Sequence, residues 1–160
     1  MKDIILDKSR NRTAVISGIF FLVFNCLYRW TNLMYNHDSL LIMRTDTSWQ
    51  ISLGRYLVPV YFEIRGKAIS PMVVALFGGT FIILSIIMCI HILYIRKKSS
   101  VIICAGLLAT FETIAYLNAS FVMSFEVDML ALLCVCIAAW LMTRSEYRFR
   151  YPAAWICKLI

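Results

Sequence analysis

Long runs of apolar residues alternate with shorter polar segments along this chain. An α-helix needs about 20 predominantly apolar residues to cross a bilayer, and four runs come close to or reach that length. The pattern therefore predicts an all-α, polytopic membrane protein, a single membrane domain over residues 1–160, with four transmembrane helices at residues 14–35, 72–95, 101–123 and 127–142. The longest polar interruption, residues 36–71, lies between the first two of these helices.

The composition supports a membrane protein and argues against soluble classes. Apolar residues make up 61% of the chain, charged residues make up 16%, and the mean hydropathy is +0.78. These values lie well outside the averages of soluble globular domains. The sequence contains no glycine pattern typical of nucleotide binding, and we expect no nucleic-acid partner.

The distribution of basic residues predicts the orientation in the membrane. If the N-terminus is cytoplasmic, the three segments on that side carry eleven of the 16 Lys and Arg residues, whereas the loop 36–71 carries four. Cytoplasmic loops are typically enriched in Lys and Arg. We therefore expect both termini in the cytoplasm and the loop 36–71, with its acids Asp38, Asp46 and Glu63, on the outer side.

The outer loop contains a stretch with helical periodicity. Between Asp46 and Ile64, apolar residues recur at spacings of three and four, on one face about 100° wide, namely Trp49, Leu53, Tyr56, Leu57, Val60 and Ile64. This pattern predicts an amphipathic helix in the membrane interface, which Asp46 or Thr47 caps and Pro59 kinks or ends. A simple membrane anchor would explain the apolar face but not Asp38 and Asp46 upstream of it.

Three further acids stand close to or within the predicted spans. Glu126 and Asp128 lie where the third and fourth helices meet on the outer side, and two such carboxylates can hold a divalent cation beside a substrate phosphate. The helix macrodipole also stabilises acids at a helix N-terminus, so both explanations stand. Glu112, near the middle of the third helix, is either a functional or interhelical pairing group or a neutral acid hydrogen-bonded within the bundle.

Other small and polar residues of the spans have simpler explanations. We expect the six cysteines to act as small apolar packing residues rather than as a disulfide framework. Gly78 and Gly79 are expected to allow two helices to pack closely. His91 is expected at the membrane interface and not in a metal site.

Two segments resemble a known family. Residues 37–40 (HDSL), Asp46 and residues 49–61 (WQISLGRYLVPVY) are similar to the first outer loop of GtrII-type glucosyltransferases, which belong to the GT-C class of membrane glycosyltransferases. Residues 124–128 (SFEVD), which run directly into an apolar helix, are similar to a second segment of that family. The resemblance covers residues 36–141.

The resemblance implies a reaction at the outer face of a bacterial inner membrane. Enzymes of this kind take a sugar from a polyprenyl-phosphate carrier and add it to a growing polysaccharide, often O-antigen. By this analogy Asp38 is the catalytic general base, which accepts the proton of the acceptor hydroxyl. Asp46 is a second candidate catalytic acid or only a helix cap.

The same analogy suggests residues that bind the substrate. Arg55 pairs with the donor phosphate, because a guanidinium group matches phosphate oxygens in a two-pronged geometry. Glu126 and Asp128 hold a divalent cation or orient that phosphate. The remaining candidate substrate-binding residues are His37, Trp49, Gln50 and Glu112.

The chain is shorter than members of the family. We therefore expect the N-terminal part of a longer glycosyltransferase, a truncated enzyme, or a subunit completed by other chains of the same pathway. The alternative function is a small four-span flippase or accessory subunit for a lipid-linked sugar. The long acidic loop argues against a minimal flippase, which has no need of one.

Overall fold

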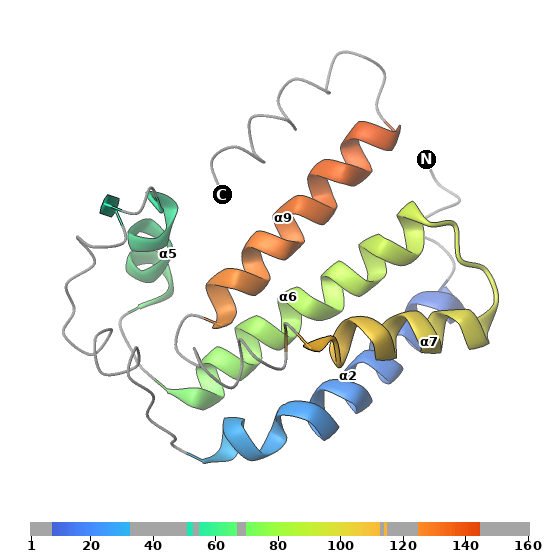
Figure 1. Cartoon of the computed structure of the whole chain (residues 1–160), viewed down its shortest axis with the longest axis horizontal. Helices are drawn as coiled ribbons and strands as arrows, with labels where there is room; N and C mark the ends of the chain where they lie inside the picture. The colour runs from blue at the N-terminus through green and yellow to red at the C-terminus, as the bar shows by residue number, and fades with distance from the viewer. Residues whose placement is uncertain are drawn as a thin grey trace.

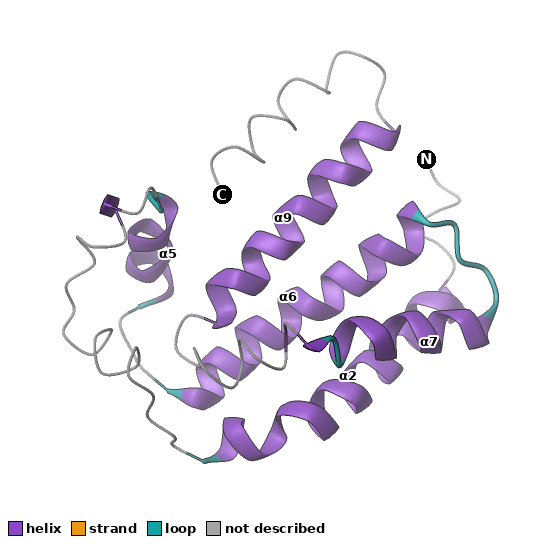
Figure 2. Ribbon diagram, in the orientation of Figure 1, coloured by secondary structure: helices purple, strands orange, loops and turns teal. Residues whose placement is uncertain are grey.

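The computed structural model describes residues 8–32, 51–52, 55–66, 70–112, 114 and 125–144. Within these residues the secondary structure is helical and contains no strand (Figure 2). The elements in chain order are α2 (Lys8–Thr31), α5 (Leu57–Arg65), α6 (Pro71–Ile92), α7 (Lys98–Ala109) and α9 (Phe125–Arg144). The predicted all-α fold is thus confirmed for the described part of the chain.

Three of these helices, α2, α6 and α9, are long and apolar enough to cross a membrane. They correspond to the first, second and fourth predicted spans, with boundaries that differ by a few residues. The shorter apolar helix α7 has 12 residues, a length of about 18 Å, against about 30 Å for the hydrocarbon core. It covers the first part of the predicted span 101–123, whose residues 113 and 115–123 lie outside the described residues.

Helix α6 is at the centre of the bundle. It packs against α9 on one side and α2 on the other, and α7 packs mainly along α2 (Figure 1). The core between the helices consists of small and branched apolar side chains, among them Leu22, Val74, Ile82, Ile86 and Val101, each at most 2% exposed. Such side chains fill the space between helices at the density of a close-packed interior.

Glycine allows the closest approach between α6 and α9. A Cβ atom at Gly78 would lie 2.8 and 2.9 Å from ring atoms of Phe125, which begins α9 and is fully buried. At Gly79 the nearest atom, on Trp30, would be 3.6 Å away, an ordinary contact. The close helix packing expected of the two glycines is therefore found at Gly78.

Helix α5 begins and ends differently from the prediction. Pro59 was expected to kink or end the loop helix, but it is the third residue of α5. The first four N–H groups of a helix have no intrahelical partner, so a proline there costs no hydrogen bond. The helix ends instead at Gly66, whose φ of 88° lies in the region that favours glycine. The predicted caps Asp46 and Thr47 lie outside the described residues.

A polar contact joins α2 and α6 at the end of the bundle away from α5. Arg10 donates from Nη2 to Nδ1 of His91 over 3.0 Å and from Nη1 to the carbonyl oxygen of Ile95 over 3.4 Å. Because arginine has no acceptor, Nδ1 of His91 accepts and the ring proton is on Nε2. His91 was expected at the interface, and its side chain is buried against α2, with 6% exposed.

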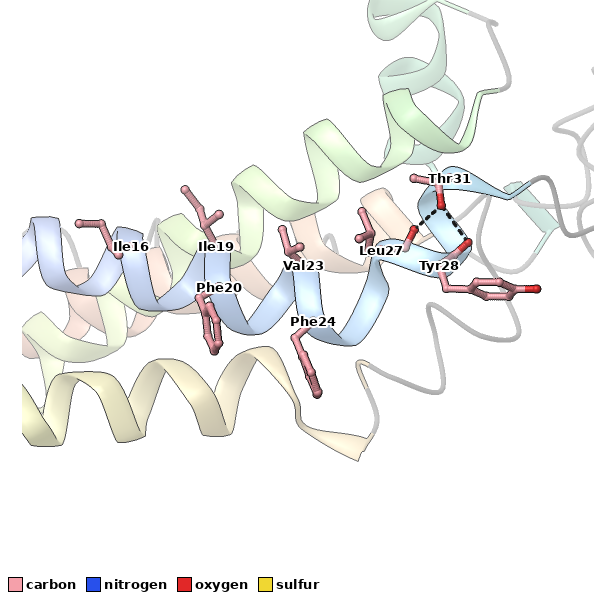
Figure 3. A pocket seen from close by; sticks show the side chains of 8 residues that line it. All are labelled: Ile16, Ile19, Phe20, Val23, Phe24, Leu27, Tyr28 and Thr31. Carbon is pink, nitrogen blue, oxygen red and sulfur yellow. Dashed lines mark hydrogen bonds between the residues drawn. The ribbon is translucent and has the colours of Figure 1, made fainter.

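One face of α2 has no protein partner among the described residues and is almost entirely apolar. A shallow hollow of about 750 Å³ runs along it, lined by Ile16, Ile19, Phe20, Val23, Phe24, Leu27, Tyr28 and Thr31 (Figure 3). The Thr31 hydroxyl donates to the carbonyl oxygens of Leu27 and Tyr28, which leaves little unsatisfied polarity on this face. Such a surface is suited to contact with lipid chains.

Candidate functional site

Helix α5 has an exposed apolar stripe and a separate side that packs towards α9. Leu57, Val60 and Ile64 lie on the exposed face and are 51%, 53% and 83% exposed. Tyr61 and Arg65 lie beside this stripe, on the side towards α9, where both contact Glu126 and where Val58 is buried. An exposed apolar stripe of this kind is typical of a helix whose outer face contacts lipid.

Glu126, in the first turn of α9, is bonded to both of these α5 side chains. Arg65 forms an ion pair and hydrogen bond from Nη2 to Oε1. The Tyr61 hydroxyl donates to Oε2 over 3.2 Å. The Glu126 side chain is 0% exposed and that of Arg65 is 4% exposed. Both carboxylate oxygens of a fully buried acid are thus bonded to α5.

Arg65 makes further contacts that fix its guanidinium group. Nη1 donates to the carbonyl oxygen of Gly66 over 3.2 Å. The guanidinium carbon lies 5.1 Å from the centre of the Phe62 ring, within the range of a cation–π interaction. An arginine held at several points in this way keeps its position well.

The same environment changes the pKa of the Tyr61 hydroxyl. Burial, and then the negative charge of Glu126, raise the pKa of its hydroxyl to about 12. Both causes disfavour the tyrosinate. Tyr61 is therefore a neutral hydrogen-bond donor at any physiological pH.

Beside this cluster, α5 and α9 enclose a small hollow of about 190 Å³. It is lined by Arg55, Leu57, Val58, Tyr61, Val127, Asp128, Leu130, Ala131 and Cys134. Two charged side chains line the hollow: Arg55, just before α5, and Asp128, in the first turn of α9. The two charges interact. Sites for drug-sized ligands are about 300–1,000 Å³, so this hollow suits a phosphate group or part of a sugar ring.

The structure brings together three of the predicted site residues. Arg55 from the outer loop and Asp128 from α9 line one hollow, and Glu126 lies immediately beside it. Residues from the loop and from the segment 124–128 therefore meet at this hollow. Asp38, Asp46, His37, Trp49 and Gln50 lie outside the described residues.

Glu112 lies apart from the bundle core. It was expected near the middle of the span 101–123; it has helical backbone, but it lies beyond the end of α7 at Ala109 and its side chain is exposed. It is not among the residues that line the hollow between α5 and α9. Within the described residues, neither of the two environments expected for Glu112 is observed, namely an interhelical pair and a buried neutral acid.

The cation site at Glu126 and Asp128 stays a prediction. Each oxygen of Glu126 accepts a hydrogen bond from α5, and Arg65 already compensates the charge of this carboxylate. Among the described residues, no group of three or more His, Cys, Asp or Glu side chains gathers in a geometry suited to a metal ion.

Sequence reasoning did not identify Tyr61 and Arg65. A signal was present, because the two residues are four positions apart and therefore neighbours on one side of the predicted amphipathic helix, next to its apolar stripe. The apolar stripe alone predicts a helix in the membrane interface, whereas the residues beside it bind Glu126.

Comparison with known proteins assigns the family. No curated protein and no solved structure gives a significant match to the chain. A family model described as Glucosyl transferase GtrII matches residues 27–160, which include α5, α6, α7 and α9. Because this match covers most of the chain, the protein belongs to the GtrII glucosyl transferase family.

Proposed function

We propose that this protein is a membrane glycosyltransferase that moves a glucosyl-type sugar from a polyprenyl-phosphate carrier to a surface polysaccharide such as O-antigen. The observation that carries the proposal is the meeting of Arg55 and Asp128 in one hollow at the start of α9, in a chain of a glucosyl transferase family. A donor of this kind has a phosphate and a sugar. Arg55 offers charge-assisted hydrogen bonds to the phosphate, and Asp128 can accept from a sugar hydroxyl.

The proposal includes a location and a topology. Four spans, namely α2, α6, α9 and the predicted span 101–123, whose first part is α7, cross a bacterial inner membrane with both termini in the cytoplasm. The exposed stripe Leu57, Val60 and Ile64 supports the placement of α5 in the outer interface. The hollow then lies at the depth of lipid headgroups, which is where the phosphate of a polyprenyl carrier is found.

Asp38 is the catalytic base of the proposal. It accepts the proton of the acceptor hydroxyl as that oxygen bonds to the anomeric carbon. The bond between this carbon and the phosphate oxygen breaks, and polyprenyl phosphate leaves with the electron pair. Arg55 compensates the charge of that leaving phosphate. Asp46 supports Asp38, while His37, Trp49, Gln50 and Glu112 contact the substrates.

The experiment is a transfer assay in membranes that contain the protein, with synthetic radiolabelled polyprenyl-phosphate glucose and lipopolysaccharide as acceptor. Loss of a general base typically costs about 10²–10⁴-fold in rate. Asp38→Asn is therefore expected to lower transfer by at least 100-fold. Glu63→Gln, which changes an exposed acid of the same loop, is the matched control and is expected to keep the wild-type rate.

Two outcomes would contradict the proposal. Unchanged transfer by Asp38→Asn would show that Asp38 is not the base. Passage of the labelled lipid across liposome membranes without transfer to the acceptor would support a flippase instead.

A further inference from the structure

The buried contact between α5 and α9 does more than bring two helices together. Arg65 and Tyr61 are one helical turn apart on α5 and hold different oxygens of the same Glu126 carboxylate. A single contact would allow α5 to turn about its own axis. Two contacts from successive turns to one rigid, fully buried group set the rotation of α5 as well as its distance from α9.

The rotation of α5 decides where Arg55 points. Arg55 directly precedes the N-cap residue Tyr56, so its direction follows that of the first turn of α5. With Glu126 bonded, Arg55 reaches the hollow that it shares with Asp128. If α5 turned about its axis, Arg55 would leave the hollow, and the apolar stripe of α5 would turn away from the lipid.

The charge of Arg65 also changes the role of Glu126. Burial of a carboxylate is costly unless a positive charge and hydrogen bonds compensate it. Arg65 supplies that charge within the protein, at the place where the sequence suggested a divalent cation. Glu126 therefore acts as the counter-ion of Arg65. Of the two acids Glu126 and Asp128, only Asp128 lines the hollow.

We propose that Arg65 is a positioning residue, which, through its bonds to Glu126 and beside Tyr61, orients α5 so that Arg55 meets the donor phosphate. The inference rests on the proposed function, because it concerns how the same hollow recognises the phosphate of the donor. It assigns Glu126 to the internal ion pair, and it makes the α5–α9 junction, rather than Arg55 alone, responsible for phosphate recognition.

A double-mutant cycle separates positioning from a general structural role. Misplacement of a binding group by about 1 Å can cost about 100-fold, so Arg65→Gln and Arg55→Gln are each expected to lower kcat/KM for the donor by about 10- to 100-fold. If Arg65 acts through Arg55, the double variant is no worse than Arg55→Gln alone. Multiplication of the two losses, or a loss in kcat without a rise in KM for the donor, would overturn the proposal.

A second measurement does not depend on activity. Val58 and Cys134 line the hollow from opposite helices, so Val58→Cys gives a thiol pair across the α5–α9 junction. A short bismaleimide is expected to link the two, and mass spectrometry of the digested protein quantifies the linked peptides. Arg65→Gln and Glu126→Gln are expected to lower the yield several-fold, and Glu63→Gln is the matched control. An unchanged yield in both variants would overturn the proposal.

These measurements also distinguish failure of the inference from failure of the proposed function. If no variant transfers sugar, including the wild type, the cross-link still reports whether Arg65 orients α5. If Arg65→Gln does not accumulate in membranes, two milder variants replace it: Arg65→Lys keeps the positive charge beside Glu126, and Tyr61→Phe keeps the Arg65–Glu126 ion pair. Both are expected to give an intermediate yield, and a wild-type yield in both would contradict the inference.

Discussion

At the scale of single residues, the ion pair between Arg65 and Glu126 places two opposite charges in a buried position. Both side chains are nearly or fully buried, so their attraction must offset the loss of two hydration shells. Pairs of this kind are often no more stable than apolar residues of the same size. Removal of one partner, in contrast, leaves a charge buried without compensation. This asymmetry gives a test of what the pair is for.

We expect the double substitution to cost much less stability than either single substitution. Arg65→Met or Glu126→Leu alone should lower the free energy of unfolding by about 3–5 kcal/mol. The double variant should recover most of that loss, since no charge remains buried, while sugar transfer stays low because α5 is no longer oriented. Unfolding of the purified protein in mixed micelles measures the first effect. Additive losses of stability would show that the two charges do not compensate each other.

Tyr61 predicts a dependence of stability on alkaline pH. Its pKa is raised from about 10 to about 12 in the folded protein. A raised pKa means that the folded state holds the proton more tightly, so the contribution of Tyr61 is complete below pH 10. It is then lost as the pH rises towards 12.

The difference between wild type and Tyr61→Phe isolates this group from the other tyrosines. We expect its tyrosinate absorbance near 295 nm to appear with a midpoint of about pH 12 in the folded protein. The stability advantage of the wild type should shrink between pH 10 and 12. A midpoint near 10 would place the Tyr61 hydroxyl in water and away from Glu126.

Glu126 as an internal counter-ion also predicts how the protein responds to divalent cations. If Glu126 bound such a cation, Glu126→Gln would raise the concentration of Mg²⁺ needed for half-maximal transfer. We expect the residual transfer of Glu126→Gln to show the same dependence on Mg²⁺ as the wild type. A shift of about tenfold or more, the scale seen when a metal site loses a supporting group, would restore the cation assignment.

At the scale of the elements, the apolar runs of the sequence predicted the long helices, but the polar contacts between helices were not predictable. The runs that became α2, α6 and α9 were predictable because a bilayer demands long, internally hydrogen-bonded helices. Contact between Arg65 and Glu126, which are 61 residues apart, was not predictable because only the fold brings them together. Pro59 was misjudged because proline breaks a helix interior but is tolerated in its first turn, and periodicity alone did not show where α5 begins.

The packing of α6 on α9 gives a prediction with an internal control. Gly78→Ala would bring a methyl group within 3 Å of the buried Phe125 ring, so α9 must shift at the residue just before Glu126. Overpacking of this kind costs about 1–3 kcal/mol. Gly79→Ala makes only an ordinary contact with Trp30 and should change stability little.

Thermal unfolding of both glycine variants in detergent tests the packing, and the Val58→Cys cross-link to Cys134 tests its effect on the site. Gly78→Ala should lower both the unfolding temperature and the cross-link yield. Gly79→Ala should lower neither. Equal behaviour of the two variants would mean that α9 does not approach α6 at Gly78.

At the scale of the whole molecule, both ends of the bundle have a polar contact between helices. At one end Arg65 and Tyr61 bind Glu126, and at the other Arg10 binds His91. Apolar packing along α6 joins them. Neither polar contact is visible in a hydropathy pattern, yet the first of them lies beside the candidate site, and its Tyr61 lines the hollow.

The proposed topology places these two ends on opposite sides of the membrane, which labelling of single cysteines can test. Glu63 is exposed on α5, and Lys97 is exposed between α6 and α7. With the N-terminus in the cytoplasm, a membrane-impermeant maleimide should label Glu63→Cys in intact spheroplasts. It should label Lys97→Cys only after permeabilisation, because the basic turn remains inside. The wild type, with its native cysteines, gives the background. Labelling of Lys97→Cys in intact cells would invert the protein and place the hollow beside Arg55 on the cytoplasmic side, where an O-antigen acceptor at the outer face is out of reach.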